Sequence, residues 1–368
     1  MSTTALKSTR VWEAVLPAVV ALGLAAVLGD LLILSFGESP AAVWTLLVKG
    51  TWGNAYGIGQ VLYKATTLTC TGLAFAMAGR AGLFNVGAEG QLAAGGFGAA
   101  VMGLLLPSAL PAVLAIPLCV VSAMMVGAAV GALPGALRAK FGASEVIVTI
   151  MLNFIVLALL NWIVSAKLHL PETLRTPDIA AGNVPRLADT FAMFRGSAAN
   201  FTLLFAVAAA VAGWWYLFRT RSGYELRAVG LQPEAAEYGG VKVPRVLFVS
   251  MAISGALAGL GGVNFVLGYK GYYEEGFAGG AGFLGIAVAL VGRNHPFGIL
   301  AAALLFATLS QGGLAVNAVV PKQLTDILTA AVILSVATAV PEVQQQIRAA
   351  AASVTASLAR KSTQGVGA

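Results

Sequence analysis

Charged residues are scarce in this chain. Asp, Glu, Lys and Arg make up 10% of its 368 residues, whereas an ordinary soluble domain carries about 25%. Hydrophobic residues make up 58%, so the sequence is not that of a soluble globular protein. The net charge of +7 is best interpreted through the positions of the basic residues, because these orient a membrane protein. Nucleic-acid binding is not needed to explain it.

Cysteine and histidine are also scarce, with two residues of each. Cys70 and Cys119 lie in apolar runs and predict small core residues, not a disulfide or a metal site. His169 and His295 are far apart and form no known zinc-binding pattern. The sequence contains no Gly-x-x-x-x-Gly-Lys-Ser/Thr phosphate loop, which excludes an ATPase of that type on this chain. We therefore expect no catalytic residue, metal or cofactor here.

Long apolar segments and 44 glycines are what the chain has instead. Glycine allows membrane helices to pack closely, and a helix crosses about 30 Å of hydrocarbon with about 20 apolar residues. The segments predict an all-α fold, a polytopic membrane helix bundle of about ten spans. Two of these, 90–107 and 278–292, are candidates for broken or re-entrant elements. The predicted spans are 14–36, 59–79, 90–107, 111–133, 145–166, 200–218, 246–268, 278–292, 296–316 and 323–341.

The distribution of Lys and Arg near the span ends predicts the orientation. It places both termini in the cytoplasm, as a segment 1–13 and a tail 342–368 that flank a transmembrane domain 14–341. Within that domain, loop 167–199 is external and loop 219–245 is cytoplasmic. The apolar stretch 14–36 is longer than the roughly 7–15-residue core of a signal peptide, so it predicts a retained first helix.

Polar side chains interrupt the apolar sequence in the stretch 79–91. Asn85, Glu89 and Gln91 lie there, and Asn153 lies in the span 145–166. Because polar groups beside apolar spans are costly unless they line a cavity or find protein partners, we interpret these four residues as candidates for a pathway or its inner gate. The alternative is that they satisfy neighbouring backbone groups or join helices.

Two further features leave alternatives open. The threonines at 66, 67, 69 and 71 either bond back to their own helix or line an aqueous route. In loop 219–245, Pro233 at a first helical turn and Gly239 just past the end predict a helix of one to two turns. Composition alone favours a solvated loop there, and a helix that docks onto a partner is the alternative.

Several motifs together resemble one family. They are Gly-Leu-Phe-Asn-Val-Gly-Ala-Glu-Gly-Gln at 82–91, Glu-Val-Ile-Val-Thr-Ile-Met-Leu-Asn at 145–153, loop 227–245, and Ser-Gly-Ala-Leu-Ala-Gly-Leu-Gly-Gly at 254–262. In this combination they resemble the membrane subunit of bacterial ABC importers in the branched-chain amino acid and ribose permease superfamily. The first motif is similar to the nucleoside branch, which depends on a basic membrane lipoprotein. The resemblance covers about residues 60–340.

The resemblance implies partners, a location and a docking element. The partners are cytoplasmic ABC ATPase subunits that bind ATP and Mg²⁺, a second permease subunit that is usually a paralogue, and an external substrate-binding lipoprotein. The location is the bacterial cytoplasmic (inner) membrane, in contact with lipid. The short helix of loop 219–245 would be the coupling helix that docks onto the ATPase, formed by Gly230, Pro233, Glu234, Ala235, Ala236, Glu237, Tyr238 and Gly239.

We therefore expect the permease subunit of an ATP-driven importer, with nucleosides as the leading substrate and a monosaccharide or a branched-chain amino acid as the alternative. A secondary carrier is a different class, but it would need mid-span carboxylates as ion ligands. Asp326 lies near the start of the last predicted span, and no other span has a central acid. A structural membrane protein would not need the polar, glycine-broken segments.

Overall fold

The computed structural model describes Gly23, residues 26–317 and the positions 319–321, 323, 326–327, 329–331 and 333–334. These residues form helices and loops, with isolated β-bridges between Arg175 and Glu274 and between Arg186 and Asn200. The all-α prediction is confirmed for this part of the chain. Two compact units are present, one of residues 48–312 and one of residues 1–47 with 313–368. Residues 14–22, 24 and 25 of the predicted span 14–36, and most of the predicted span 323–341, lie outside the described residues.

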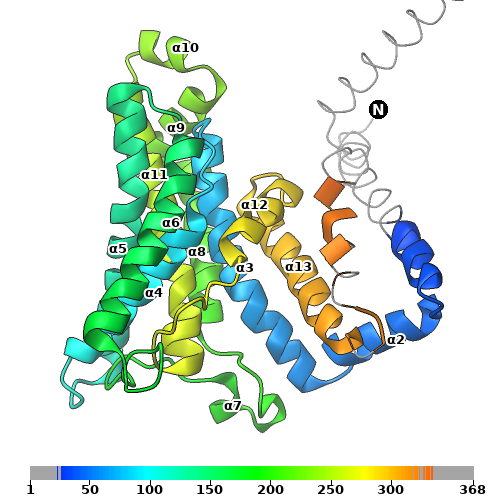
Figure 1. Cartoon of the computed structure of the whole chain (residues 1–368). Coiled ribbons are helices and arrows are strands. Elements are labelled where there is room, and N and C mark those ends of the chain that lie inside the picture. The colour runs from blue at the N-terminus through cyan, green and yellow to red at the C-terminus, as the bar shows by residue number, and fades with distance from the viewer. Residues whose placement is uncertain are drawn as a thin grey trace, which may run out of the picture. The chain divides into compact units, whose positions relative to one another are not determined.

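Most helices follow one another through short connections, and the longer loops are 169–186 and 271–280. The helices are α2 (Pro40–Thr51), α3 (Ala55–Arg80), α4 (Ala88–Leu105), α5 (Ala112–Phe141), α6 (Glu145–Ile163) with the π-helix η1 (Val164–Leu168), α7 (Leu187–Thr190), the 3₁₀ turn η2 (Ala192–Phe194), α8 (Thr202–Arg219), α9 (Arg221–Leu231), α10 (Pro233–Tyr238), α11 (Val243–Phe265) with the π-helix η3 (Val266–Lys270), α12 (Ala281–Val291) and α13 (Pro296–Val316). In the unit 48–312, α9 and α10 lie at one end and α7 at the opposite end (Figure 1).

Six described helices are long and apolar enough to cross a membrane, or up to seven if Ala26–Ser35 and Pro40–Thr51, which meet at 115°, form one span. The predicted count of about ten is thus not confirmed among the described residues. Segment 278–292, a candidate for a broken or re-entrant element, contains a helix shorter than the segment itself. Gly279 and Gly280 have φ angles of 54° and 85°, which a helix cannot accommodate, so α12 begins only at Ala281. Its 11 residues rise about 16 Å, against the roughly 30 Å of a bilayer core.

Glycines allow α11 to lie against α4 and α5, which are neighbours in Figure 1. A Cβ on Gly131 of α5 would lie 2.5 Å from the carbonyl oxygen of Met251 and 2.9 Å from Cα of Gly255. On α11, a Cβ on Gly259 would lie 2.5 Å from the carbonyl oxygen of Ala123. Such backbone contact is possible only without side chains, and it is a common way for membrane helices to associate.

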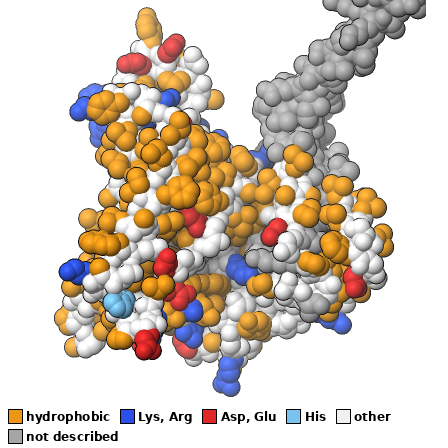
Figure 2. All heavy atoms as spheres, viewed as in Figure 1, with side chains coloured by type: hydrophobic (Ala, Val, Ile, Leu, Met, Phe, Trp, Pro, Cys, Tyr) orange, Lys and Arg blue, Asp and Glu red, His pale blue; other side chains and the backbone are white. Residues whose placement is uncertain are grey.

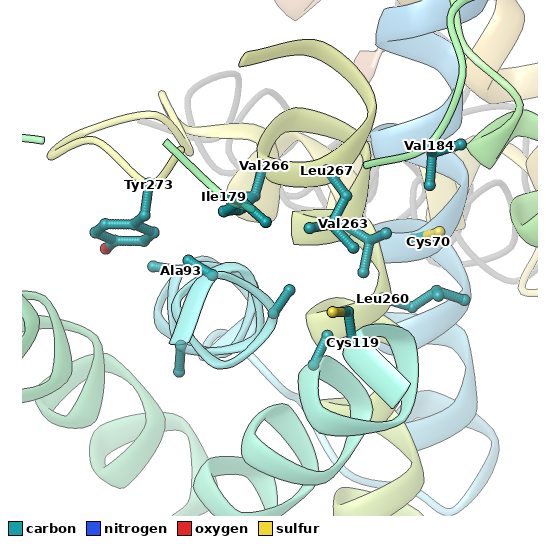
Figure 3. Close-up of a cluster of buried hydrophobic side chains, with 14 of the residues drawn as sticks. Cys70, Ala93, Cys119, Ile179, Val184, Leu260, Val263, Val266, Leu267 and Tyr273 are labelled. Atoms are coloured by element: carbon teal, nitrogen blue, oxygen red, sulfur yellow. The ribbon is translucent and has the colours of Figure 1, made fainter. Parts of the chain in front are cut away.

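Small apolar side chains fill the space between these helices. Cys70 of α3 and Cys119 of α5 are free and buried, as predicted. Figure 3 shows them in one cluster with residues from α4, α11, η3 and the loop before α7. Tyr273 is the largest of its fully buried side chains. The cluster joins the helices that surround α4.

Apolar side chains also cover the outside of the unit 48–312. Figure 2 shows hydrophobic residues over α5 and α6, with charged residues mostly near the ends. Among the exposed ones are Val121 and Met125 of α5 and Phe154 and Trp162 of α6. In water such a surface would be unfavourable, whereas in a bilayer it contacts lipid tails.

We predict that Gly131→Ala destabilises the protein by about 1–3 kcal/mol, because the new methyl group meets backbone that cannot move away. Gly213→Ala in α8 is the matched control, since its Cβ would find Leu73 and Pro296 at 4.0 Å. Removing a helical glycine there is expected to be neutral or to stabilise by about 0.5–1 kcal/mol. Thermal unfolding of the purified chain in detergent measures both. Equal unfolding temperatures for the two variants would contradict the close approach of α5 and α11.

Candidate functional site

The irregular segment between α3 and α4, residues 81–87, is organised by Asn85. Its amide nitrogen donates to Oε1 of Gln91 at 2.8 Å and to Oγ of Ser254 at 2.7 Å. Its Oδ1 accepts from the backbone N–H of Gly87 at 2.9 Å and from Nε2 of Gln91 at 3.2 Å. Both side chains are buried. Asn85 thus connects the start of α4 to α11.

Asn153 of α6 holds the same segment from the other side. Its Oδ1 accepts from the backbone N–H of Gly90, and its Nδ2 donates to the carbonyl oxygen of Val86, each at 2.9 Å. This buried amide replaces the helical hydrogen bonds that the chain lacks where α4 begins. The structure therefore brings Asn85, Gln91 and Asn153 together around one stretch of backbone.

Glu89 connects this stretch to α12. Its carboxylate accepts from the backbone N–H groups of Gly280 at 2.8 Å and Gly282 at 2.7 Å. These N–H groups are at the N-terminal end of α12, where a negative charge is favourable. A Cβ on Gly282 would collide with the backbone of Glu89. The stretch 79–91 and the start of the candidate span 278–292, which are about 190 residues apart in the sequence, therefore form one site.

The four predicted pathway residues are thus buried, and each bonds to groups of this chain. These contacts agree with the alternative interpretation, in which the polar side chains satisfy backbone groups and join helices. Their contact with a transported solute stays a prediction.

A cavity of about 290 Å³ lies beside this arrangement, between α3, α11, α12 and α13. Gly280 and Ala281 form part of its wall, so Glu89 positions that wall. The side chains that give the cavity its chemistry are Tyr63, Lys64, Thr67, Phe265, Phe277 and Ser310.

Aromatic rings and hydrogen-bonding groups both line this cavity. The rings of Phe265 and Phe277 stack at 4.7 Å between centroids. Nζ of Lys64 donates to Oγ of Ser310 at 3.2 Å. Asn264 donates to Oγ1 of Thr67 at 2.8 Å and holds this hydroxyl in place. The combination suits a solute that carries both a ring and hydroxyl groups.

Of the threonines in α3, one fits the aqueous-route interpretation. Thr67 lines the cavity. Thr66 donates to the carbonyl oxygen of Leu62 at 2.8 Å, and Thr71 to those of Thr67 at 3.2 Å and Ala281 at 3.1 Å. The sequence does not predict that Phe265, Phe277 and Ser310 line a cavity, because isolated aromatic and serine residues in apolar segments carry no distinguishing signal.

The predicted short helix of loop 219–245 is confirmed from Pro233 to Tyr238, with Gly239 at its C-cap. Gly230 does not belong to it. Gln232 is extended, as expected before a proline, and it separates α10 from α9, whose last turn contains Gly230. Leu231 is 85% exposed and Tyr238 is 98% exposed. Leu231 ends α9 and Tyr238 ends α10, so both leave most of their side-chain surface uncovered by this chain.

A junction connects α9 to the turn between α12 and α13. Gly230 contacts the backbone of Arg80 at the end of α3. Arg80 in turn donates from Nε to the carbonyl oxygen of Asn294 at 3.0 Å. The guanidinium groups of Arg80 and Arg227 lie 5.8 Å and 5.2 Å from the ring of Phe218.

His295 stacks on the same Phe218 ring at 5.5 Å. Burial, and after it the charge of Arg80, lowers the pKa of the His295 imidazole below its ordinary value. The imidazole is therefore neutral at pH 7, and it adds no third positive charge to Arg80 and Arg227.

We predict that Asn153→Ala lowers the free energy of unfolding by about 1–3 kcal/mol, because it leaves a buried N–H and a buried carbonyl group unpaired. Asn161→Ala in the same helix is the control, since the Asn161 amide bonds to Glu275 at an exposed position. We expect a change of about 0.5 kcal/mol or less there. Thermal unfolding in detergent measures stability, and uptake per folded molecule measures transport. A stable Asn153→Ala protein without transport would assign Asn153 to the pathway.

Comparison with known proteins places the chain in a family. The family model described as branched-chain amino acid transport system / permease component matches residues 57–337. The chain is 37% identical over 317 residues to the nucleoside ABC transporter permease protein NupB of Lactococcus lactis, covering 84% of this chain and 87% of NupB.

Two other relatives are similar over comparable lengths. The chain is 37% identical over 329 residues to the guanosine ABC transporter permease protein NupP of Bacillus subtilis, covering 86% and 90% of the two chains. It is 32% identical over 318 residues to the glucose ABC transporter permease protein TsgB13 of Haloferax volcanii, covering 83% and 82%. The chain therefore belongs to the permease components of the branched-chain amino acid transport system family, and is a multi-pass membrane transport subunit, not an enzyme.

Proposed function

We propose that this chain is the permease subunit of an ATP-driven importer of nucleosides in the bacterial inner membrane. The observation that carries the proposal is the 37% identity to permeases named for nucleosides and guanosine. The relative named for glucose makes a monosaccharide the second candidate. The stacked rings of Phe265 and Phe277 favour the nucleoside, because a base offers a planar π-face to an aromatic wall and a sugar alone does not.

The cavity at α12 is the part of the pathway that this chain supplies. Hydroxyl groups of Thr67 and Ser310 and the ammonium group of Lys64 line it and match the hydroxyls of a ribose. Three such polar groups would bind the solute only weakly. Weak binding fits a solute that is delivered by a binding protein and must leave the cavity again, because tight binding would slow its release. Behind the cavity wall, Glu89 holds the start of α12. The start of α4, to which Glu89 belongs, is held by Asn85, Gln91 and Asn153.

The membrane arrangement follows from the basic residues. The end with α9 and α10 faces the cytoplasm, and loop 167–199 with α7 faces outward. The transmembrane domain is 14–341 and is built from about ten apolar segments, of which α4 and α12 are incomplete or re-entrant elements. Segments 1–13 and 342–368 are then cytoplasmic.

The partners are those that the resemblance to ABC permeases implies, and the exposed Leu231 and Tyr238 form the docking surface for one of them. Cytoplasmic ABC ATPase subunits, which supply ATP and Mg²⁺, receive α10 as the coupling helix. A second, paralogous permease completes the pathway, and an external lipoprotein delivers the solute. The described contacts offer a route for coupling, because α9 reaches the α12–α13 turn through Gly230 and Arg80. A shift of α10 would therefore move a wall of the cavity.

We predict that Phe277→Ala raises the KM for nucleoside uptake about three- to tenfold, with little change in maximal rate, because about 0.5–1.5 kcal/mol of stacking is lost. Phe283→Ala is the control, since Phe283 lies on α12, is exposed and does not line the cavity. Uptake of radiolabelled guanosine and glucose is measured in cells that lack the native gene. Glucose uptake without guanosine uptake would select the monosaccharide, and equal KM values for both variants would remove Phe277 from the site.

We predict that Leu231→Ser with Tyr238→Ser lowers uptake about tenfold or more while the chain still inserts in the membrane, because two exposed apolar anchors of the docking surface are lost. Glu234→Ala with Glu237→Ala tests the charges of α10. Tyr224→Ser is the control, because Tyr224 is an exposed aromatic residue in the first half of α9, away from the turn that joins Leu231 to α10. Solute-stimulated ATPase activity of the reconstituted complex is the measurement. Full stimulation in the Leu231/Tyr238 variant would argue against docking through α10.

A further inference from the structure

Two hollows meet beside α8, where Tyr216 lines both of them. The first has a volume of about 360 Å³, lies at the α9 end, and is bordered by Arg221, Glu225, Lys242 and Arg245. The second has a volume of about 380 Å³ and is apolar, with Met77, Met124, Phe205, Ile253 and Leu257 in its wall.

The two hollows share Tyr216 and follow each other along one face of α11, and together they are called the groove here. On α11, residues 246 and 249 line the first hollow and 253, 257 and 260 line the second, a spacing that keeps them on one helix face. On α8, residues 205, 209, 212 and 216 are spaced in the same way. The stretch 246–260 rises about 21 Å, which exceeds half of the roughly 30 Å hydrocarbon core. The groove therefore runs from a charged end into the depth of one leaflet.

The charged end attracts anions. Arg221 pairs with Glu225 at 2.8 Å. Lys242 and Arg245 are exposed and take part in none of the ion pairs found among the described residues. Two cations beside an apolar groove match a phosphate headgroup that is continued by an acyl chain. A free phosphate ion would use only the charged end, and an apolar helix of a partner only the other part.

We propose that this groove binds one anionic phospholipid, with the phosphate against Lys242 and Arg245 and one acyl chain along α8 and α11. The exposed Ala208 and Ala212 and the adjacent Gly213 leave room on α8 for the chain. The lipid lies at the base of α9 and α10 and links the two helices that carry them. The proposal rests on the membrane position of α8 and α11 and does not depend on which solute is transported.

Native mass spectrometry of the full chain, purified in detergent with added phosphatidylglycerol or phosphatidylcholine, tests the headgroup. We expect the wild type to retain phosphatidylglycerol preferentially, and Lys242→Gln with Arg245→Gln to reduce that retention about tenfold or more. The matched control is Arg138→Gln with Lys140→Gln, which removes two cations from the end of α5. Equal retention in the two double variants, or no preference in the wild type, would overturn the proposal.

Ala212→Trp tests the acyl chain, because it fills the groove without changing a charge. We expect it to release phosphatidylglycerol, whereas Val211→Trp, at an exposed position that does not line the groove, retains it. Displacement of bound lipid by inorganic phosphate at millimolar concentration would indicate a phosphate site instead. Loss of the second permease from the purified complex, with lipid retention unchanged in Ala212→Trp, would indicate that a partner helix occupies the groove. Either result overturns the proposal.

Discussion

The carboxylate of Glu89 is the contact on which the central part of this protein depends. Inside a bilayer no water satisfies the N–H groups at a helix start, so a helix that begins at membrane depth needs an acceptor from the protein. Glu89 supplies it for α12 through Gly280 and Gly282. The same residue belongs to the first turn of α4, whose own entry is held by Asn85 and Asn153. One set of polar contacts thus holds the first turns of two helices, α4 and α12, together.

Close packing around α11 makes that arrangement rigid. Glycines on α5 and α11 bring the backbones of the two helices into contact. In a membrane, van der Waals packing at such close contacts stabilises helix association, because the hydrophobic effect does not act between helices there. Ser254 on α11 receives the amide of Asn85, so the glycine-lined seam and the polar site share a helix. Both features shape the cavity next to α12. Phe265 of α11 lines it, and so do Gly280 and Ala281, which lie at the site held by Glu89.

Contacts of Arg80 connect this rigid centre to the end of the unit where α9 and α10 lie. The aromatic and hydroxyl groups of the cavity lie on α3, α11, α13 and the loop before α12, whereas the exposed Leu231 ends α9 and the exposed Tyr238 ends α10. The Arg80 side chain bridges the two regions, since it bonds to the α12–α13 turn while its backbone contacts Gly230. The lipid groove lies on a different side, between α8 and α11, and concerns the stability of the α9–α10 base and not the solute.

Hydropathy, composition and the positions of proline and glycine are signals that act over short distances along the chain. From them the sequence alone predicts the membrane class, the helical fold, the small buried cysteines, the family and the helix from Pro233 to Tyr238. The tertiary structure alone decided that Glu89 caps α12, that α12 is too short to cross, and that Gly230 belongs to α9. It also brought Tyr63, Phe265, Phe277 and Ser310 to one cavity. These residues are far apart in the chain, and which of them meet depends on helix packing, for which a single sequence has no local signal.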